Sequence, residues 1–152
     1  MAVAVDRVPP QSLEAEMGVL GSMLLDRDAI AAVVELLRPE DFYREAHRLV
    51  YSAIVDLFER GEPVDLITVT ARLRDLGKLE EAGGAAYVSS LLNAVPTAAN
   101  AEYYARIVLQ KSMLRALIRV GTQIAHLGFE GDEDVEVLVD RAERLGFGTA
   151  NR

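Results

Sequence analysis

The chain contains no cysteine, which excludes disulfide bonds and thiolate metal sites. It has only two histidines, His47 and His126, which lie far apart in sequence. His47 could join a charged site, but each histidine is more typical of a surface residue or a satisfied structural residue. No apolar run approaches the ~18 residues that a membrane span needs. The first residues also lack the basic-then-apolar layout of a secretory signal. We therefore expect a cytoplasmic protein that does not enter a membrane.

Basic residues are scarce as well. The chain has 16 Lys and Arg against 24 Asp and Glu, a formal net charge of −8. Gripping nucleic acid through its phosphates needs a basic surface, so this balance argues against a protein whose main task is to bind DNA or RNA. Of the 152 residues 51% are hydrophobic, enough for a core in one domain, or in one domain with an appendage.

Signals of catalysis are missing too. Gly77-Lys78 is followed by Leu79 and has no glycine five residues upstream, so it is not a phosphate-binding loop. Ser22 lies within a helical pattern and is not a nucleophile elbow. The acidic run Asp132-Glu133-Asp134 lacks the glycine and the terminal Glu of a calcium loop and is typical of a solvated helix start. We expect no catalytic residue, cofactor site or metal site in this chain.

Apolar residues recur at spacings of three and four along most of the chain and predict an all-α fold. Ser12 is the expected N-cap of the first helix, with carboxylates in its first turn. Gly18 and Gly21 lie inside this helix, where each is either merely tolerated or needed for the close approach of another helix. The further predicted helices cover residues 29–37, 44–60, 66–76, 85–93, 98–127 and 132–145.

These elements divide into a compact helical head and an antiparallel helical hairpin. Residues 1–96 are expected to form an N-terminal arm and the head, and residues 97–145 the hairpin, with Thr97 capping its first helix. The two hairpin helices are joined by a short glycine-marked turn at 128–131, which makes them antiparallel. Gly146-Phe147-Gly148 is expected to end the ordered part, so residues 146–152 are predicted to be the start of a linker or a disordered tail.

The long helix has an apolar arc of about half its circumference, wider than the ~100° stripe of an ordinary surface helix. The last helix is too short and its apolar stripe too narrow to cover this arc. The remaining surface must contact either the globular part or another chain, and both alternatives stay open. The residues predicted for self-association are Leu114, Leu117, Val120 and Ile124. A basic line on the same helix is either solvated or contacts phosphates or an acidic partner: Arg106, Lys111, Arg115 and Arg119.

Several motifs in a fixed order carry a family resemblance. They are Pro9-Pro10-Gln11-Ser12-Leu13-Glu14-Ala15-Glu16, Val19-Leu20-Gly21-Ser22-Met23-Leu24-Leu25-Asp26, Phe42-Tyr43-Arg44-Glu45-Ala46-His47, Gly61-Glu62-Pro63-Val64-Asp65, Gly83-Gly84 with Tyr87, and Val95-Pro96-Thr97-Ala98-Ala99-Asn100 with Tyr103-Tyr104-Ala105. Together they cover about residues 7–145. In this order and spacing they resemble the N-terminal domain of the bacterial DnaB-type replicative DNA helicase.

The resemblance implies an all-helical head followed by a hairpin. In that family the hairpins pair, and the pairs form a trimer of dimers, a collar on a hexameric ring that single-stranded DNA threads. The collar docks primase, and a helicase loader is a further partner that the resemblance allows. ATP and Mg²⁺ belong to a RecA-like domain that follows. The expected function is therefore a non-catalytic assembly and docking domain in the bacterial cytoplasm, with Tyr87, Ile118 and Ile124 as the predicted primase contacts.

The alternative is a small helical regulatory protein that binds DNA. Residues 65–93 mimic a helix-turn-helix segment. The supposed recognition helix, 85–93, has no Arg or Lys, which counts against this alternative. DNA affinity at low and moderate salt distinguishes the two.

Overall fold

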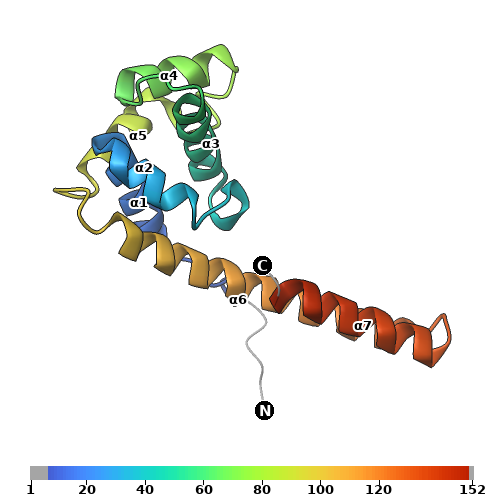
Figure 1. Ribbon diagram of the computed structural model, residues 1–152. Helices are drawn as coiled ribbons and strands as arrows, with labels where there is room; N and C mark the ends of the chain where they lie inside the picture. Colours follow the sequence, from blue (N-terminus) through green and yellow to red (C-terminus); the bar gives the residue numbers. More distant parts are fainter. Residues whose placement is uncertain (1–6, 151–152) are drawn as a thin grey trace. The chain divides into compact units, whose positions relative to one another are not determined.

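The computed structural model describes residues 7–150 (Figure 1). Within these residues every regular element is helical, as predicted. The elements are α1 (Leu13–Leu25), α2 (Arg27–Val34), η1 (Pro39–Asp41), α3 (Glu45–Glu59), α4 (Leu66–Asp75), α5 (Gly84–Ser90), η2 (Leu91–Asn93), α6 (Ala101–Glu130) and α7 (Val135–Ala150), where η1 and η2 are 3₁₀ turns.

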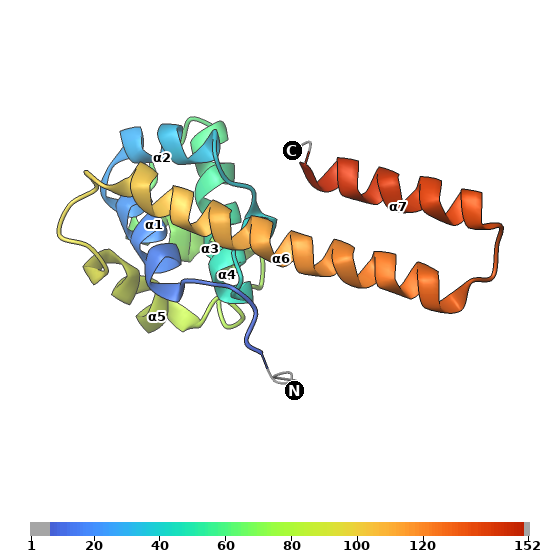
Figure 2. The same cartoon turned by 90° about the horizontal axis from the view of Figure 1, so that it is seen from below.

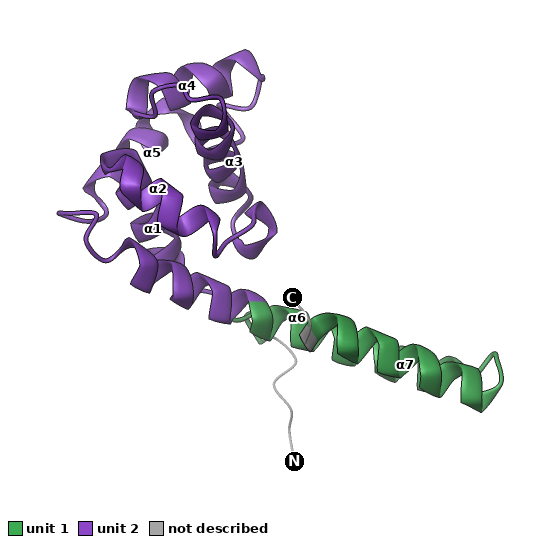
Figure 3. Ribbon diagram, in the orientation of Figure 1, with its two compact units in different colours: residues 1–10, 113–152 green, residues 11–112 purple. Residues whose placement is uncertain are grey.

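The chain forms two compact units (Figure 3). One comprises residues 11–112, which we call the head; the other comprises residues 113–150, the hairpin, together with residues 7–10. This division falls inside α6, whereas the sequence placed the boundary at residue 96. The physical reason is that Ala101, Ala105 and Val108, in the first turns of α6, are buried in the core of the head.

The head has a single hydrophobic core at the centre of which α1 lies. Helix α1 packs against α2, α3 and η2, and α3 packs against α4. The largest fully buried apolar side chains come from all of these elements: Leu20, Met23, Ile30, Phe42, Tyr51, Ile54, Leu73 and Leu91. The head therefore has one core to which all of these helices contribute.

The two glycines of α1 are required by close approach. A Cβ atom at Gly18 would lie 2.9 Å from the ring of Tyr104, and one at Gly21 only 2.4 Å from the carbonyl oxygen of Leu91. Contacts this short do not occur in real structures, so a side chain at either position displaces its neighbour. Close approach, one of the two readings of these glycines, is confirmed.

The helix ends follow their caps. Ser12 caps α1 as predicted, its Oγ accepting a hydrogen bond from the backbone N–H of Ala15 at 3.2 Å. Helix α2 begins at Arg27, two residues before the predicted start, because the Asp26 carboxylate accepts from the N–H of Asp28 at 2.9 Å and caps it. The single helix predicted over 85–93 is instead α5 followed by η2.

The predicted bounds of the last two helices were wrong. Thr97 does not cap α6, which begins at Ala101; its Oγ1 accepts from the N–H of Ala99 within the preceding turn. Helix α7 begins at Val135 and continues to Ala150, through the glycines that were expected to end it. A glycine costs a helix interior only about 1 kcal/mol relative to Ala, and α7 tolerates two. Of the predicted tail, residues 146–150 are therefore helical, and 151–152 lie outside the described residues.

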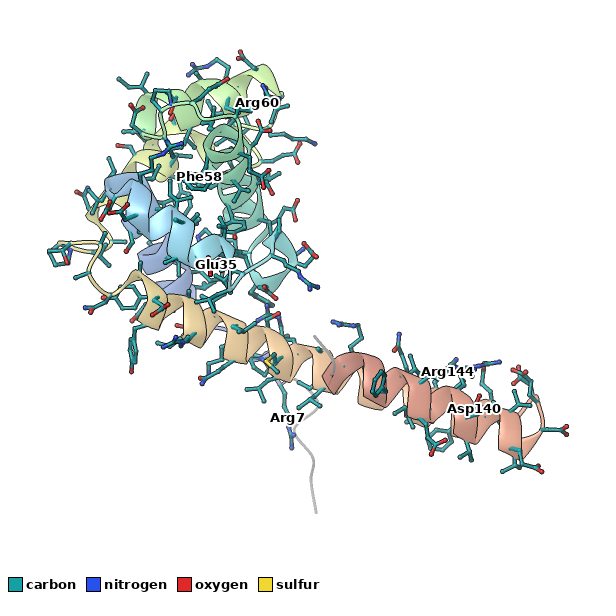
Figure 4. The ribbon with its side chains drawn as sticks, viewed as in Figure 1. Arg7, Glu35, Phe58, Arg60, Asp140 and Arg144 are labelled. Atoms are coloured by element: carbon teal, nitrogen blue, oxygen red, sulfur yellow. The ribbon has the colours of Figure 1, made fainter. Side chains whose placement is uncertain are left out.

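The second half of α6 and α7 run side by side in opposite directions (Figure 2), as the short connection predicted. Ion pairs stabilise α7 along its exposed side: Asp140 pairs with Arg144 one turn later (Figure 4), and Arg141 pairs with Glu133 at 2.5 Å. Among the described residues no helix is long and apolar enough to cross a membrane.

Candidate assembly and docking surfaces

The hairpin has no core of its own. Beyond Val108, none of the side chains that the structure describes is buried. Large apolar side chains are instead exposed along both helices: Met113, Leu114, Leu117, Ile118, Ile124, Phe129, Val135, Val137, Val139 and Phe147. Two packed helices cover only the seam between them. The hairpin therefore leaves an apolar surface exposed.

A hollow of about 340 Å³ lies between α6 and α7 within the hairpin. Its walls are almost entirely apolar. They are formed by Met113, Leu117, Val120, Gly121, Ile124, Gly146 and Thr149. The glycines contribute to the hollow because each lacks a side chain and each faces open space.

Three of the four residues predicted for self-association therefore share one surface: Leu117, Val120 and Ile124 line the hollow. Leu114 does not line it, although its side chain is 43% exposed. The sequence argument that α7 leaves part of α6 uncovered agrees with these exposures.

The predicted primase contacts come from both units of the chain. Ile118 is 56% exposed on α6 and lies outside the hollow, whereas Ile124 lines it. Tyr87 belongs to α5 in the head, where its ring is partly buried against the core. Ile124 was predicted for both self-association and docking, and its position groups it with Leu117 and Val120.

Tyr87 lies at one end of a hydrogen-bonded series of side chains in the head. Its hydroxyl lies 2.6 Å from Nε2 of His47, and Nδ1 of His47 lies 2.7 Å from a carboxylate oxygen of Glu16. The guanidinium of Arg44 donates to the same hydroxyl at 3.2 Å. His47 and Glu16 are almost completely buried, at 0% and 1% exposure.

The structural reading of His47 is thus confirmed, but the sequence did not identify its partners. From the sequence, Glu16 was expected only as a first-turn carboxylate of α1. In the structure it also accepts from the backbone N–H groups of Tyr43 and Arg44, at 2.7 and 3.5 Å, at the entrance to α3. A carboxylate there is favoured by the helix dipole of α3. Since 31 residues separate Glu16 from His47, no local pattern could have paired them.

A second buried carboxylate, Asp41, connects η1 to α6 inside the head. Its two oxygens accept from the hydroxyl of Ser112 and from the backbone N–H of Arg38, each at 2.7 Å.

The buried Tyr51 hydroxyl donates to the carbonyl of Leu37 at 2.7 Å. Burial raises the pKa of Tyr51 well above its usual range, and the carboxylates of Asp41 and Glu59 raise it further. Tyr51 therefore stays neutral throughout the physiological range.

Two residues of the basic line on α6 contact other groups of the chain. Arg106 pairs with Glu102 one turn earlier at 3.6 Å, and the guanidinium of Arg115 donates to the carbonyl of Pro10 at 2.7 Å. These contacts do not favour a continuous phosphate-binding surface. Residues 7–150 also contain no group of three or more His, Asp or Glu placed to hold a metal ion.

Comparison with known proteins gives a consistent result. The family model of the DnaB-like helicase N terminal domain matches residues 8–110. The replicative DNA helicase DnaB of Geobacillus stearothermophilus is 54% identical over 139 residues, which cover 91% of this chain and 31% of that protein. The chain thus spans about a third of the length of this relative.

Solved structures agree with the sequence comparison. The crystal structure of the N-terminal domain of DnaB helicase from Mycobacterium tuberculosis matches with a TM-score of 0.90 and 52% identity, over 93% of this chain and 99% of that one. A DnaB-like replicative helicase, described with its interactions with primase, matches with a TM-score of 0.72 and 26% identity, over 91% of this chain and 31% of that one. The alternative of a small DNA-binding regulator is not supported by these matches, and α5, its supposed recognition helix, carries no basic residue.

Proposed function

Because the chain belongs to the DnaB-like helicase N-terminal domain family, we propose that it is a non-catalytic assembly and docking domain of a replicative DNA helicase. In this proposal its hairpins pair into dimers, three dimers build the collar of a hexameric ring, and the collar docks primase. The compartment is the bacterial cytoplasm.

One observation carries the assembly part of the proposal: the hairpin exposes an apolar surface on both helices and has no buried residue in its described part. A second hairpin would supply the missing layer, since four helices enclose a core that two helices lack. A symmetric pairing would use the same surface on both copies, so Leu117, Val120 and Ile124 of each hairpin would contribute twice.

The docking part is supported by the DnaB-like replicative helicase that has been described with its interactions with primase. The exposed side chain of Ile118 and the partly buried ring of Tyr87 suit an interface, because a few apolar and aromatic anchors usually carry most of the binding energy. Ile124 is the third proposed contact, in competition with its role in pairing.

Catalysis would belong to another part of the longer protein. The chain corresponds to about a third of its relative and carries no phosphate-binding loop, so we expect no ATP hydrolysis from it. ATP and Mg²⁺, single-stranded DNA in the ring and a helicase loader are partners proposed for the whole protein. Nucleotide turnover by this chain above that of a mock purification would contradict this division of labour.

Two measurements test the proposal. Sedimentation velocity over a concentration series should show a monomer–dimer equilibrium, and titration calorimetry should show binding of the C-terminal domain of the cognate primase. A chain that stays monomeric at every concentration contradicts the assembly role. A chain that binds no primase in its dimeric form contradicts the docking role.

A further inference from the structure

We assign the hydrogen bonds around Tyr87 to the direction in which its hydroxyl both accepts and donates. An arginine can only donate, so the Tyr87 oxygen accepts from Arg44, and in this assignment its own O–H donates to Nε2 of His47. With a neutral imidazole, Nδ1 then carries the proton and donates to the carboxylate of Glu16. Each side chain therefore donates to the next in the order Arg44, Tyr87, His47 and Glu16.

The ring of Tyr87 is fixed at its root, its face and its tip. At the root it lies against Gly83, where an added Cβ would come within 2.6 Å of the ring and where φ is +101°. The Arg44 guanidinium carbon lies 5.9 Å from the centre of the ring. At the tip the hydroxyl bonds to His47, whose ring plane is within 14° of the Tyr87 ring plane.

Helix α5 by itself cannot provide this rigidity. It has seven residues and no side-chain cap at its N-terminus. Glu16 and His47, in contrast, are held by α1 and α3, which form the centre of the head, and the buried carboxylate is tied to the backbone as well as to the imidazole. The buried side chains of Glu16 and His47 thus orient Tyr87 through the hydrogen bond to its hydroxyl.

We propose that Glu16 and His47 are positioning residues that hold Tyr87 ready to bind primase. This inference rests on the proposed docking role of Tyr87. A side chain that is already ordered loses little entropy on binding, whereas a mobile one loses part of the binding energy. Releasing Tyr87 should therefore weaken primase binding about three- to tenfold without removing any atom from the interface.

The variant Glu16→Gln tests this directly. Its carbonyl oxygen can still accept from the N–H of Tyr43, but its amide faces His47 and donates where the carboxylate accepted. The proton of His47 then moves to Nε2, so that the imidazole donates to the Tyr87 oxygen and no longer accepts from it. Nitrogen-15 shifts of the imidazole report this change of tautomer. In the wild type the Nδ1–H form is expected, and an Nε2–H form or an imidazolium there would contradict the assigned direction.

Binding is then measured by calorimetry, with the C-terminal domain of the cognate primase, for the wild type, Glu16→Gln, Tyr87→Phe and the double variant. Each single variant should weaken binding about three- to tenfold, and the double variant no more than the weaker-binding single, because both act through one hydroxyl. Tyr51→Phe is the matched control. It removes another buried tyrosine hydroxyl bond of the head and should lower the melting temperature while leaving primase affinity unchanged.

The possible failures are distinguishable. If Tyr87→Ala binds primase as the wild type does, the proposed docking role of Tyr87 fails and this inference fails with it. If Tyr87→Ala binds weakly but Glu16→Gln binds as the wild type, or if the two effects add in the double variant, only the positioning role is overturned. Should Glu16→Gln not fold, Arg44→Ala at the exposed end of the chain replaces it in the same cycle, with the same expected non-additivity.

Discussion

Replacing Leu117 by Glu gives the sharpest test of hairpin pairing. Leu117 lines the hollow between α6 and α7 and is 59% exposed. A carboxylate at this position is therefore solvated in the monomer and costs the fold little. In a dimer that covers the hollow, the same carboxylate would be taken out of water.

The magnitude follows from the exposed fraction. Complete burial of a Leu side chain contributes roughly 1.5–3 kcal/mol, so covering the 59% that is exposed contributes roughly 0.9–1.8 kcal/mol. A symmetric dimer contains this residue twice, which gives roughly 2–3.5 kcal/mol. Since 1.4 kcal/mol is tenfold in affinity, Leu117→Glu should raise the dimer dissociation constant at least roughly 30- to 300-fold, and desolvation of the carboxylate adds to this.

The assay is sedimentation equilibrium over a concentration series, with circular dichroism as the measure of helix content. Ile67→Glu is the matched control, because Ile67 is 79% exposed on α4 of the head and receives the same charge. We expect the control to dimerise as the wild type does. Leu117→Glu should remain monomeric with unchanged helical signal.

Two results would refute the reasoning. Equal dissociation constants for Leu117→Glu and Ile67→Glu would mean that the hollow is not covered by a second copy. Loss of helical signal in Leu117→Glu would mean that Leu117 stabilises the single chain, contrary to its exposure.

Three further predictions concern the head and the docking surface. Gly21→Ala should destabilise the chain by roughly 1–3 kcal/mol in urea unfolding, because its Cβ would lie 2.4 Å from the Leu91 oxygen. The control Gly128→Ala, whose Cβ would meet open space, should increase stability by up to about 1 kcal/mol. Equal effects of the two substitutions would contradict the close approach at Gly21. Because the pKa of Tyr51 is raised in the folded chain, the stability contributed by its neutral form is complete below about pH 10 and falls by about 1.4 kcal/mol per pH unit above it. In Tyr51→Phe, the free energy of unfolding should therefore depend less on pH between about pH 9 and 11. Ile118→Asp should weaken binding of the cognate primase C-terminal domain at least about fivefold in calorimetry with little change in melting temperature, because Ile118 is 56% exposed; unchanged affinity would place the docking surface elsewhere.

Most of the helices could be predicted from the sequence, because a helix is a local structure. Spacing of apolar residues and a capping side chain act within one or two turns, which is why the start of α1 at Ser12 and the hairpin topology were predicted correctly. The start of α6 and the end of α7 were not predicted correctly. Thr97 lies in a turn that precedes α6, and each of the two glycines in α7 costs the helix only about 1 kcal/mol relative to Ala. The motifs that identify the family are also local, and the family match confirms them.

Only the tertiary structure decided which side chains from separate helices meet. Glu16 became a buried partner of His47, and His47 a partner of Tyr87, because α1, α3 and α5 pack together in the head. Gly18 proved necessary because Tyr104, 86 positions further along the chain, lies against it. The wide apolar arc of α6 was visible in the sequence, but two alternatives for its cover remained open. The packing divided the arc: the first turns of α6 enter the core of the head, whereas beyond Val108 the described side chains have no core to enter.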